Sequence, residues 1–536
     1  MSVSRCLQAC VGSLLTICAG VSVASAAPPK LTMLFPAGGQ VGSEFVVTAS
    51  GEFADWPVEV WSSHSDVQIK AEADKGKLRV TVAKEAAPGV VWLRLFNAEG
   101  ASSPRPLLID QLPEVAEQEP NNSPDKPQTV ALPGIVNGKL NKSGDVDAYA
   151  VTLAEGETLV ASLRAHSLLG APLDGVLQIC ELRERRLSSL ANSPPQIEAF
   201  ILKQNNDAFG LDPQIEFTAP RAGVYLVRVF SFSAEPNSTI GFAGADNYLY
   251  RLTLTNSGLV EYTLPKPGDN QQRLAFGPGL PAAGSATTSH FLANVAGFAH
   301  NSATDQIHEQ DAPAALAAKP ALLRIAGQLS APEEIDTFRF HAAKNATTIL
   351  SVRARTHGSP LDAMLIVTDA EGKVLSDADD ADRKPDPRLT FKAPAEGEYT
   401  VAVRDVHRRG GLRYAYELVL DQQQTGAELT LAADAFTVAA GGKLEIPVTL
   451  QRGAQAKEIE ISATPLPTGV TAEPAVSKTE GDSAKSVKLV LNVAADAPPG
   501  NYPITIGAEQ SPANIPSPAA LADPPTIVWL TITAAK

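Results

Sequence analysis

The chain has 536 residues and a formal net charge of −15 at pH 7, which at about 100–150 residues per domain predicts three to five domains. The acidic charge repels phosphate groups and argues against nucleic acid as a partner. Glycine and proline are both frequent, with 39 and 41 residues, which favours short strands joined by turns over long helices.

The first 26 residues predict a secretory signal peptide. Arg5 precedes an apolar run from Val11 to Val23, and Ala24-Ser25-Ala26 forms a small-x-small cleavage site. Cleavage near Ala26 would place the mature chain in the periplasm, at the cell surface or outside the cell. No later segment is apolar and long enough to span a bilayer, so no membrane span is expected. The mature chain would keep one cysteine, Cys180, and therefore no internal disulfide.

Residues 30–113 form a first β-rich block. The stretches FPAGGQVGSEFVVTASGEF and APGVVWLRLFNAEGAS resemble the immunoglobulin-type or IPT/TIG sandwich that opens large secreted proteins of planctomycete-type bacteria. Trp92, within VVWLRLF, is predicted to be buried in the core. Trp56 and Trp61 are five residues apart and would face opposite sides of a strand. At most one of these two side chains is expected on a binding face.

A unit of about 100–140 residues then occurs twice, over 114–256 and 319–422. GDVDAYAVTL and GAPLDGVLQI of the first copy correspond to EEIDTFRFHA and GSPLDAMLIV of the second. Further on, DPQIEFTAPRAGVYLVRV corresponds to DPRLTFKAPAEGEYTVAV. These stretches alternate polar and apolar residues and are separated by turn residues, which predicts a β-sandwich for each copy.

The landmarks EPNN (119–122), GDVDAY (144–149), FTAPRAGVYLVRV and YLYRLTL resemble those of the bacterial pre-peptidase C-terminal domain. In the second copy the first landmark has become EQDAP (309–313). The resemblance implies secreted β-sandwich modules, related in fold to the collagen-binding domains of clostridial collagenases, that usually accompany a protease.

Residues 257–318 are predicted to be a linker or a truncated β segment. Residues 426–536 contain FTVAAGGKLEIPVTLQR and APPGNYPITIGA and resemble the immunoglobulin-like domains associated with bacterial glycosidases. The expected fold class is therefore all-β, with tandem sandwiches of jelly-roll or immunoglobulin type arranged as beads on a string.

Catalytic motifs are missing from the sequence. There is no GxSxG, HExxH or GxxxxGK[ST], the patterns of a nucleophile elbow, a zinc protease helix and a phosphate-binding loop. The four β blocks also leave no room for a protease domain, so we expect a chain that is not an enzyme.

Two corresponding loops are candidate calcium sites, because calcium takes several carboxylate and carbonyl oxygens as ligands. The alternative is turn formation, which Asp and Asn also favour. In the second copy the candidate ligands are Asp377, Asp379, Asp380, Asp382 and Asp386, and in the first copy they are Asn205, Asn206, Asp207 and Asp212. The second copy is the stronger candidate, since it has carboxylates where the first has two amides.

Asp174 and Asp362 follow Pro-Leu in the repeated phrase. Each is expected to cap backbone N–H groups or to pair with the arginine of the preceding strand, Arg164 or Arg353. The phrase is thus interpreted as a corner that the sandwich fold requires.

Together these features predict a secreted, non-catalytic binding or adhesion protein whose partner is an extracellular polymer or a secreted protein. One alternative is an accessory or non-catalytic relative of a secreted peptidase, and another is a structural spacer of the cell envelope. Calcium is the one cofactor that the residues suggest.

Overall fold

The computed structural model describes most of the chain after residue 26. The described residues are 27–185, 196–208, 210–233, 241–280, 291–292, 306–318, 322–355, 359–380, 386–422, 427–452, 458–508, 511–512 and 527–535. The predicted signal peptide lies outside these residues. Among the described residues, no helix combines the length and the apolar character that crossing a bilayer requires.

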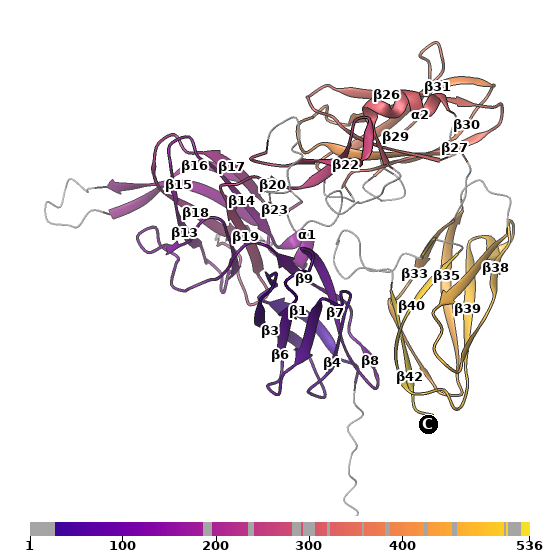
Figure 1. The fold of residues 1–536 in the computed structure, drawn as a ribbon, viewed down its shortest axis with the longest axis horizontal. Helices are drawn as coiled ribbons and strands as arrows, with labels where there is room; N and C mark the ends of the chain where they lie inside the picture. Colours follow the sequence, from indigo (N-terminus) through magenta and orange to yellow (C-terminus); the bar gives the residue numbers. More distant parts are fainter. Residues whose placement is uncertain are drawn as a thin grey trace, which may run out of the picture.

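Residues 30–110 form the first sandwich (Figure 1). One sheet has the order β1 (Lys30–Phe35), β3 (Glu44–Glu52), β6 (Lys77–Val82), β5 (Val67–Ala71), and the other has β2 (Gly38–Gln40), β9 (Arg105–Asp110), β7 (Gly89–Asn97), β4 (Glu59–Ser62), with β8 (Gly100–Ala101) paired to β7. In β6 the side chains of Leu78, Val80 and Val82 are buried and those between them are not. This alternation is what places one face of each sheet in the core.

The tryptophans of this sandwich have three different surroundings. Trp92 is buried, as its position in an apolar run predicts. Trp56 packs against the first core, and its Nε1 donates to the carbonyl of Glu72 at 2.7 Å. Trp61 instead contacts Trp529 of the last sandwich, with ring centroids 5.8 Å apart. Trp56 and Trp61 therefore lie in different environments.

The first repeated unit is a sandwich of two five-stranded sheets. Their orders are β10 (Glu114–Ala116), β12 (Gly134–Lys139), β19 (Leu249–Thr255), β14 (Thr158–Arg164), β17 (Gln214–Thr218), and β11 (Gln128–Thr129), β13 (Asp147–Leu153), β18 (Gly223–Ser231), β15 (Gly175–Arg185), β16 (Gln196–Asn205). A short helix, α1 (His166–Leu169), follows β14. Leu173 of the repeated Pro-Leu-Asp phrase is fully buried in the core.

The second unit has the same strand order, except that its second sheet has no described counterpart of β11. Its sheets are β24 (Gln306–His308), β25 (Leu322–Gln328), β32 (Ala415–Asp421), β27 (Thr347–Arg353), β30 (Arg388–Lys392), and β26 (Ile335–Ala342), β31 (Gly397–Asp405), β28 (Ala363–Thr368), β29 (Val374–Ala378). Leu361 is fully buried at the position of Leu173. The two units therefore share one topology, and the Pro-Leu-Asp phrase supplies a core leucine to each.

The second unit begins earlier than residue 319. Strand β24 pairs in parallel with β25, and η2 (Glu309–Asp311) and α2 (Ala312–Ala317) follow it. Leu316 of α2 is buried in the core of this unit. Part of the segment 257–318 thus belongs to the second sandwich, because its short strand completes the edge of a sheet.

The rest of the described linker is a hairpin that packs onto the second unit. β21 (Tyr262–Lys266) pairs with β22 (Asp269–Phe276), and the short strand β20 (Leu259–Val260) pairs with β23 (Phe291–Leu292). Tyr262 and Phe276 stack at 5.2 Å and share a buried cluster with Ala326 and Ala415. This segment is consequently part of the folded structure.

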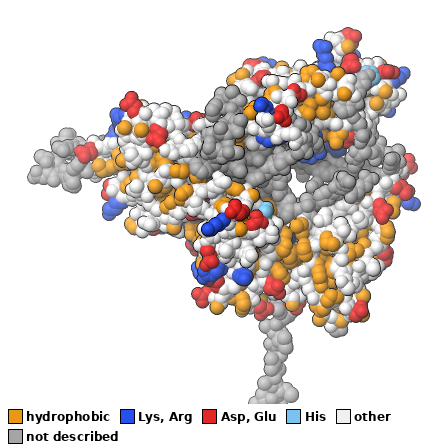
Figure 2. Space-filling view, viewed as in Figure 1, with side chains coloured by type: hydrophobic (Ala, Val, Ile, Leu, Met, Phe, Trp, Pro, Cys, Tyr) orange, Lys and Arg blue, Asp and Glu red, His pale blue; other side chains and the backbone are white. Residues whose placement is uncertain are grey.

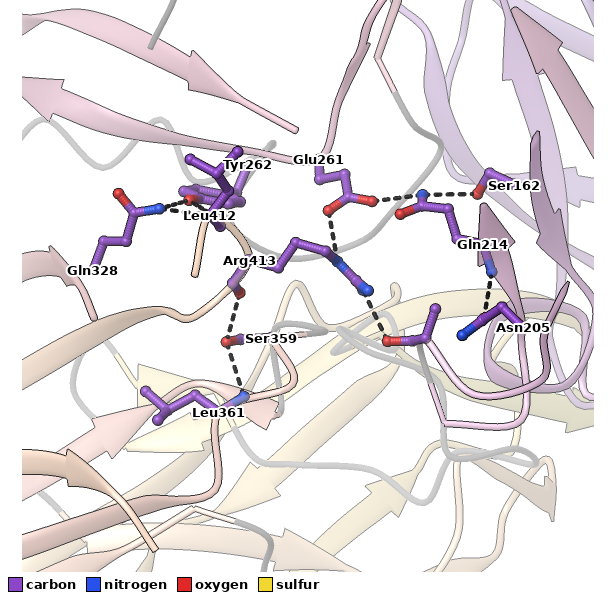
Figure 3. A network of polar contacts seen from close by, with 11 residues as sticks. Ser162, Asn205, Gln214, Glu261, Tyr262, Gln328, Ser359, Leu361, Leu412 and Arg413 are labelled. Atoms are coloured by element: carbon purple, nitrogen blue, oxygen red, sulfur yellow. Dashed lines mark hydrogen bonds and ion pairs between the residues drawn. The ribbon is translucent and has the colours of Figure 1, made fainter. Parts of the chain in front are cut away.

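The hairpin also joins the two repeated units (Figure 3). Glu261, which is buried, accepts from Gln214 of the first unit at 2.6 Å and pairs with Nε of Arg413 of the second at 2.9 Å. Arg413 also donates to the carbonyl of Ala208 in the first unit at 2.8 Å. A buried ionic contact therefore connects the linker to both sandwiches.

Residues 427–533 form the last sandwich. One sheet has the order β33 (Ala427–Leu431), β35 (Lys443–Arg452), β39 (Ser486–Val493), β37 (Val470–Glu473). The other has the order β34 (Ala435–Ala439), β42 (Val528–Thr533), β40 (Gly500–Ala508), β36 (Ile459–Thr464), β38 (Ala475–Ser477), with β41 (Ser511–Pro512) paired to β40. The short 3-10 helix η4 (Asp482–Ala484) lies between β38 and β39. Its Asn501 donates to the carbonyl of Asn97 in the first sandwich at 2.9 Å. The domains follow one another like beads along the chain, yet the first and last touch.

Candidate metal centre

Three carboxylates of the first unit meet where the chain enters strand β13. Glu119 follows β10, Asp145 lies in the turn before β13, and Asp147 is the first residue of β13. One carboxylate oxygen from each lies within 4.8 Å of those of the other two. Glu119 is exposed, whereas Asp145 and Asp147 are fully buried. Among the residues that the structure describes, this is the one set of three acidic, histidine or cysteine side chains so arranged.

The turn before β13 is held by its own backbone. Gly144 has a φ of 84°, in the left-handed region that favours glycine. Its N–H donates to the carbonyl of Phe242 at 2.8 Å, and the N–H of Asn141 donates to Asp145 Oδ2 at 2.7 Å. The sequence GD at 144–145 thus fixes the direction of the Asp145 carboxylate.

Three asparagine side chains surround the carboxylates. Asn122 and Asn141 donate to Asp145 and to Glu119, the latter contact at 3.2 Å. The buried Asn121 amide lies 3.1 Å from Glu119 Oε2 and 3.2 Å from Asp147 Oδ1. With its nitrogen toward them it donates to both, and with its oxygen toward them it adds an amide oxygen to the set.

Burial makes this concentration of negative charge costly. Desolvation and the neighbouring carboxylate of Glu117 raise the pKa of Asp147 far above the usual range of an aspartate. Desolvation, together with Glu119, also raises the pKa of Asp145. Either protons or a cation must offset the repulsion among these groups.

Two tyrosines support the cluster from the core side. Tyr250 donates to Asp147, and Tyr149 donates to Glu117 at 3.0 Å. The Tyr250 ring lies against Gly138, where an added Cβ would be 2.2 Å from a ring carbon. Gly138 is therefore needed to let the tyrosine reach the carboxylates.

The residues present fit a hard divalent cation such as calcium. Carboxylate and amide oxygens are the ligands that calcium prefers, and it takes six to eight of them. The trio contains no histidine or cysteine, the ligands typical of structural zinc sites. Glu119, Asp145 and Asp147 would hold the ion, with Asn121 as a further oxygen ligand.

The equivalent groups of the second unit are arranged differently. Asp336 accepts from Tyr416 at 2.6 Å, like Asp147 and Tyr250. Glu309 accepts from the backbone N–H of Gln328 at 3.1 Å, and Asp311 accepts from the N–H of Gly268 in the linker hairpin at 2.8 Å. Asp311 is the third residue after β24, as Glu119 is the third after the equivalent strand β10, so the counterpart of Glu119 binds the hairpin turn.

The loops proposed from sequence hold their polar groups in local contacts. Asp212 is fully buried and accepts from the N–H groups of Ala165, His166 and Ser167 at 3.2, 2.7 and 3.1 Å. Three N–H donors at the start of α1 therefore account for its carboxylate.

The remaining candidates of the first copy also bind locally. Asn205 accepts from the N–H of Gln214 at 3.0 Å, and Asn206 donates to Asp207 at 2.7 Å. These contacts are typical of the turn alternative.

In the second copy Asp386 accepts from the N–H of Arg355 at 2.8 Å, and Asp379 accepts from the N–H of Asp380 at 2.7 Å. Asp377 lies in β29, and Asp382 lies outside the described residues. Calcium binding at either loop stays a prediction.

The sequence patterns did not indicate the trio as a candidate metal site, although EPNN and GDVDAY were both identified as landmarks. The signal was the pairing of two acidic phrases more than twenty residues apart. Calcium binding was predicted for the two loops instead, because aspartate and asparagine residues are concentrated there.

A comparison with protein families finds a match in one of the two repeated units. The sequence model of the bacterial pre-peptidase C-terminal domain matches residues 334–405. A search of the curated proteins finds no match. The family match therefore covers part of the second unit, from β26 to β31, and the resemblance of the first unit to the same family remains an expectation from its landmarks.

Solved structures with local similarity include three bacterial proteins. The pre-peptidase C-terminal domain of a collagenase from Bacillus anthracis is 15% identical, and the match covers 25% of this chain and all of that domain, with a TM-score of 0.17. The periplasmic g-type lysozyme inhibitor of Aeromonas hydrophila is 16% identical over 27% and 95%, with a TM-score of 0.15.

A glucan-utilisation protein of Bacteroides ovatus, SGBP-B, is 9% identical over 74% of each chain, with a TM-score of 0.15. At these scores the three likenesses carry no argument about function. The family match alone bears on the identity of part of the molecule: residues 334–405 match the bacterial pre-peptidase C-terminal domain.

Proposed function

We propose that this protein is a secreted, non-catalytic binding protein that acts on an extracellular polymer or protein at the cell surface. The observation that carries the proposal is the match of residues 334–405 to the pre-peptidase C-terminal domain, which is a non-catalytic domain. The match fits a binding or accessory role.

The arrangement of the domains supports a binding role. Glu261 and Arg413 join the repeated units through buried contacts, so the two units would be presented to a ligand in a fixed relative position. Two weak sites in one chain gain from high effective concentration when both can engage the same polymer.

The carboxylate trio supports a role for a divalent cation in that binding. An ion held by Glu119, Asp145 and Asp147 would fix the segment before β13 against the strand. Because this segment lies at the surface of the first unit, the loops around it would become rigid enough to present a defined surface.

A pelleting assay tests the proposal. The purified mature protein, residues 27–536, is mixed with insoluble collagen, cellulose, chitin and peptidoglycan, in calcium and again in EDTA. We expect retention on one of these polymers in calcium and weaker retention in EDTA. Equal retention in both buffers would remove the cation from the mechanism, and no retention on any polymer would contradict binding to these four polymers.

The family match also favours a second candidate, an accessory of a secreted peptidase. In that case the protein would bind the peptidase or its substrate and would not cleave casein alone. Hydrolysis of casein by the pure protein would contradict both candidates. Assembly of the pure protein into sheets or filaments without any ligand would instead support a structural spacer of the cell envelope.

A further inference from the structure

The end strand β16 of the first unit differs from its equivalent in the second. β16 has ten residues and lies at the end of its sheet, where β15 is its only partner among the described strands. Its equivalent β29 has five residues and the sequence VLSDA. Figure 1 shows β15 and β16 extending beyond the rest of the first unit, on the side away from the other sandwiches.

Three consecutive apolar side chains of β16 are exposed to solvent. Phe200, Ile201 and Leu202 are 47%, 45% and 36% exposed, and Figure 2 shows hydrophobic side chains at the surface of this unit, on the left of the view. Exposed sheet edges normally avoid such residues, because an apolar edge with unpaired N–H and C=O groups pairs with other strands. The short, acidic β29 shows that the fold itself does not require a long apolar edge here.

The register of the β15–β16 pair assigns the side chains of β16 to two faces. Phe200 lies opposite Glu181 and Glu198 opposite Arg183, while Lys203 lies opposite Ile179 of the core face. The Arg183 guanidinium stacks on the Phe200 ring at 3.5 Å. An irregularity in the pairing between Ile179 and Cys180 makes Leu202 the extra residue.

Because of this bulge, Lys203 returns to the face that carries Glu198 and Phe200. The other face carries Ala199 and Ile201, opposite Leu182 and Cys180. The strand therefore has an acidic residue and a basic residue on one face, on either side of its apolar centre. The Lys203 ammonium donates to the backbone carbonyl of Glu216 in its own chain at 2.6 Å, and its other two N–H donors can reach a carboxylate.

We propose that β16 is a self-association surface, on which a second copy of this chain pairs its own β16 in antiparallel fashion. With the twofold axis at Phe200, the two Phe200 side chains meet and Ala199 of each strand lies opposite Ile201 of the other. Glu198 of each copy then comes beside Lys203 of its partner, twice by symmetry. The pairing satisfies both edges, covers the apolar residues and matches unlike charges.

The charge pattern of β16 indicates that its partner is the same strand of a second copy of the chain. A strand of uniform charge would fit an oppositely charged partner better, whereas β16 has one acidic and one basic residue, Glu198 and Lys203. An isologous dimer uses the same patch on both subunits, so one strand must contain both halves of every contact. β16 meets that condition through Glu198 and Lys203.

Sedimentation velocity of the mature chain over a hundredfold concentration range tests the proposal. We expect reversible dimerisation in the wild type. Ile201→Lys should raise the dimer dissociation constant about tenfold or more, since it places two like charges near the axis. Val374→Lys is the matched control, because Val374 is an exposed apolar residue of the equivalent edge strand β29, and it should leave dimerisation unchanged.

Charge exchange tests the register independently. Glu198→Lys and Lys203→Glu should each weaken the dimer, and the double variant should restore it, because unlike charges again face each other. A wild type that is monomeric at every concentration would overturn the proposal, and so would a dimer that Ile201→Lys leaves intact. Failure of the double variant to recover would overturn the proposed pairing of Glu198 with Lys203.

Discussion

The guanidinium of Arg94 in the first sandwich lies 6.0 Å from the ring centroid of Trp529 in the last. Arg94 also forms an ion pair with Asp434 at 2.7 Å and is fully buried. Trp529 is only 1% exposed, although it faces outward from its own core, because Trp61 and Phe96 of the first sandwich cover it. These contacts join the first sandwich to the last, so the row of domains forms a closed arrangement.

Removing the Trp529 side chain should separate the last sandwich from the first. Truncation of a buried tryptophan costs about 3–5 kcal/mol, and here much of the loss falls on the contact between two domains. We expect Trp529→Ala to increase the radius of gyration in small-angle X-ray scattering and to lower the first thermal transition.

Trp56→Ala is the control for the loss of an indole ring. Trp56 packs within the first sandwich against Phe53, at 5.3 Å, so this change should destabilise the domain and leave the overall dimensions of the folded protein unchanged. An unchanged radius of gyration in Trp529→Ala would contradict a closed arrangement in solution.

The sequence predicts the sandwiches well and their contacts poorly. Alternation in strands such as β6 shows which face is buried, and the repeated Pro-Leu-Asp phrase correctly indicates a shared corner. Alternation cannot say what covers an outward-facing residue. Arg94 and Trp529 each lie on the face opposite the core, and only the arrangement of the domains shows that they meet.

The partner of Asp362 shows the same limit at shorter range. We expected Asp362 to cap backbone N–H groups or to pair with Arg353, but it pairs with Arg355 at 3.1 Å. Arg353 lies directly opposite Glu417 in the strand register and pairs with it at 3.4 Å. Arg353 pairs with its cross-strand neighbour Glu417 because the strand register places these two side chains on the same face of the sheet.

Asp110 should make the stability of the first sandwich depend on pH. Burial raises its pKa to about 6, against the opposing charge of Arg251. The folded state therefore holds the proton more tightly than the unfolded state, whose pKa is 3.8. The stabilisation is complete below about pH 3.8 and is lost as the pH rises through about 6, a loss of about 2–3 kcal/mol.

Asp110→Asn should remove that loss. Asp110 Oδ1 accepts from the N–H groups of Gln111 and Leu112 at 2.7 and 3.3 Å, and an amide oxygen can accept both bonds. In urea denaturation we expect the variant to be more stable than the wild type at pH 7.5 and to gain little at pH 4. Asp66→Asn, on the surface of the same sandwich, controls for the change in net charge. A variant that is less stable at pH 7.5 would contradict the prediction.

Arg413 should be critical for the joint between the repeated units. Its removal leaves the buried Glu261 carboxylate without the ion pair at 2.9 Å, and loss of one partner from a buried pair costs about 3–5 kcal/mol. We expect Arg413→Met to lower the thermal transition of the two units strongly. Arg408→Met removes an arginine whose pair with Glu333 is exposed and should cost less than about 1 kcal/mol. Equal effects of the two changes would contradict a buried joint.

Calcium should stabilise the first unit through the carboxylate trio. A ligand at a hundred times its dissociation constant adds about 2.7 kcal/mol, which corresponds to a rise of about 5–10 °C in melting temperature for a domain of this size. Asp147→Asn should abolish that rise and the heat of binding in calorimetry, because it removes a central carboxylate of the trio. Asp379→Asn combined with Asp380→Asn tests the loop of the second unit in the same assay and should leave the rise intact. If the loop variant loses the rise and Asp147→Asn keeps it, the cation site lies in the loop and the trio is held together by protons.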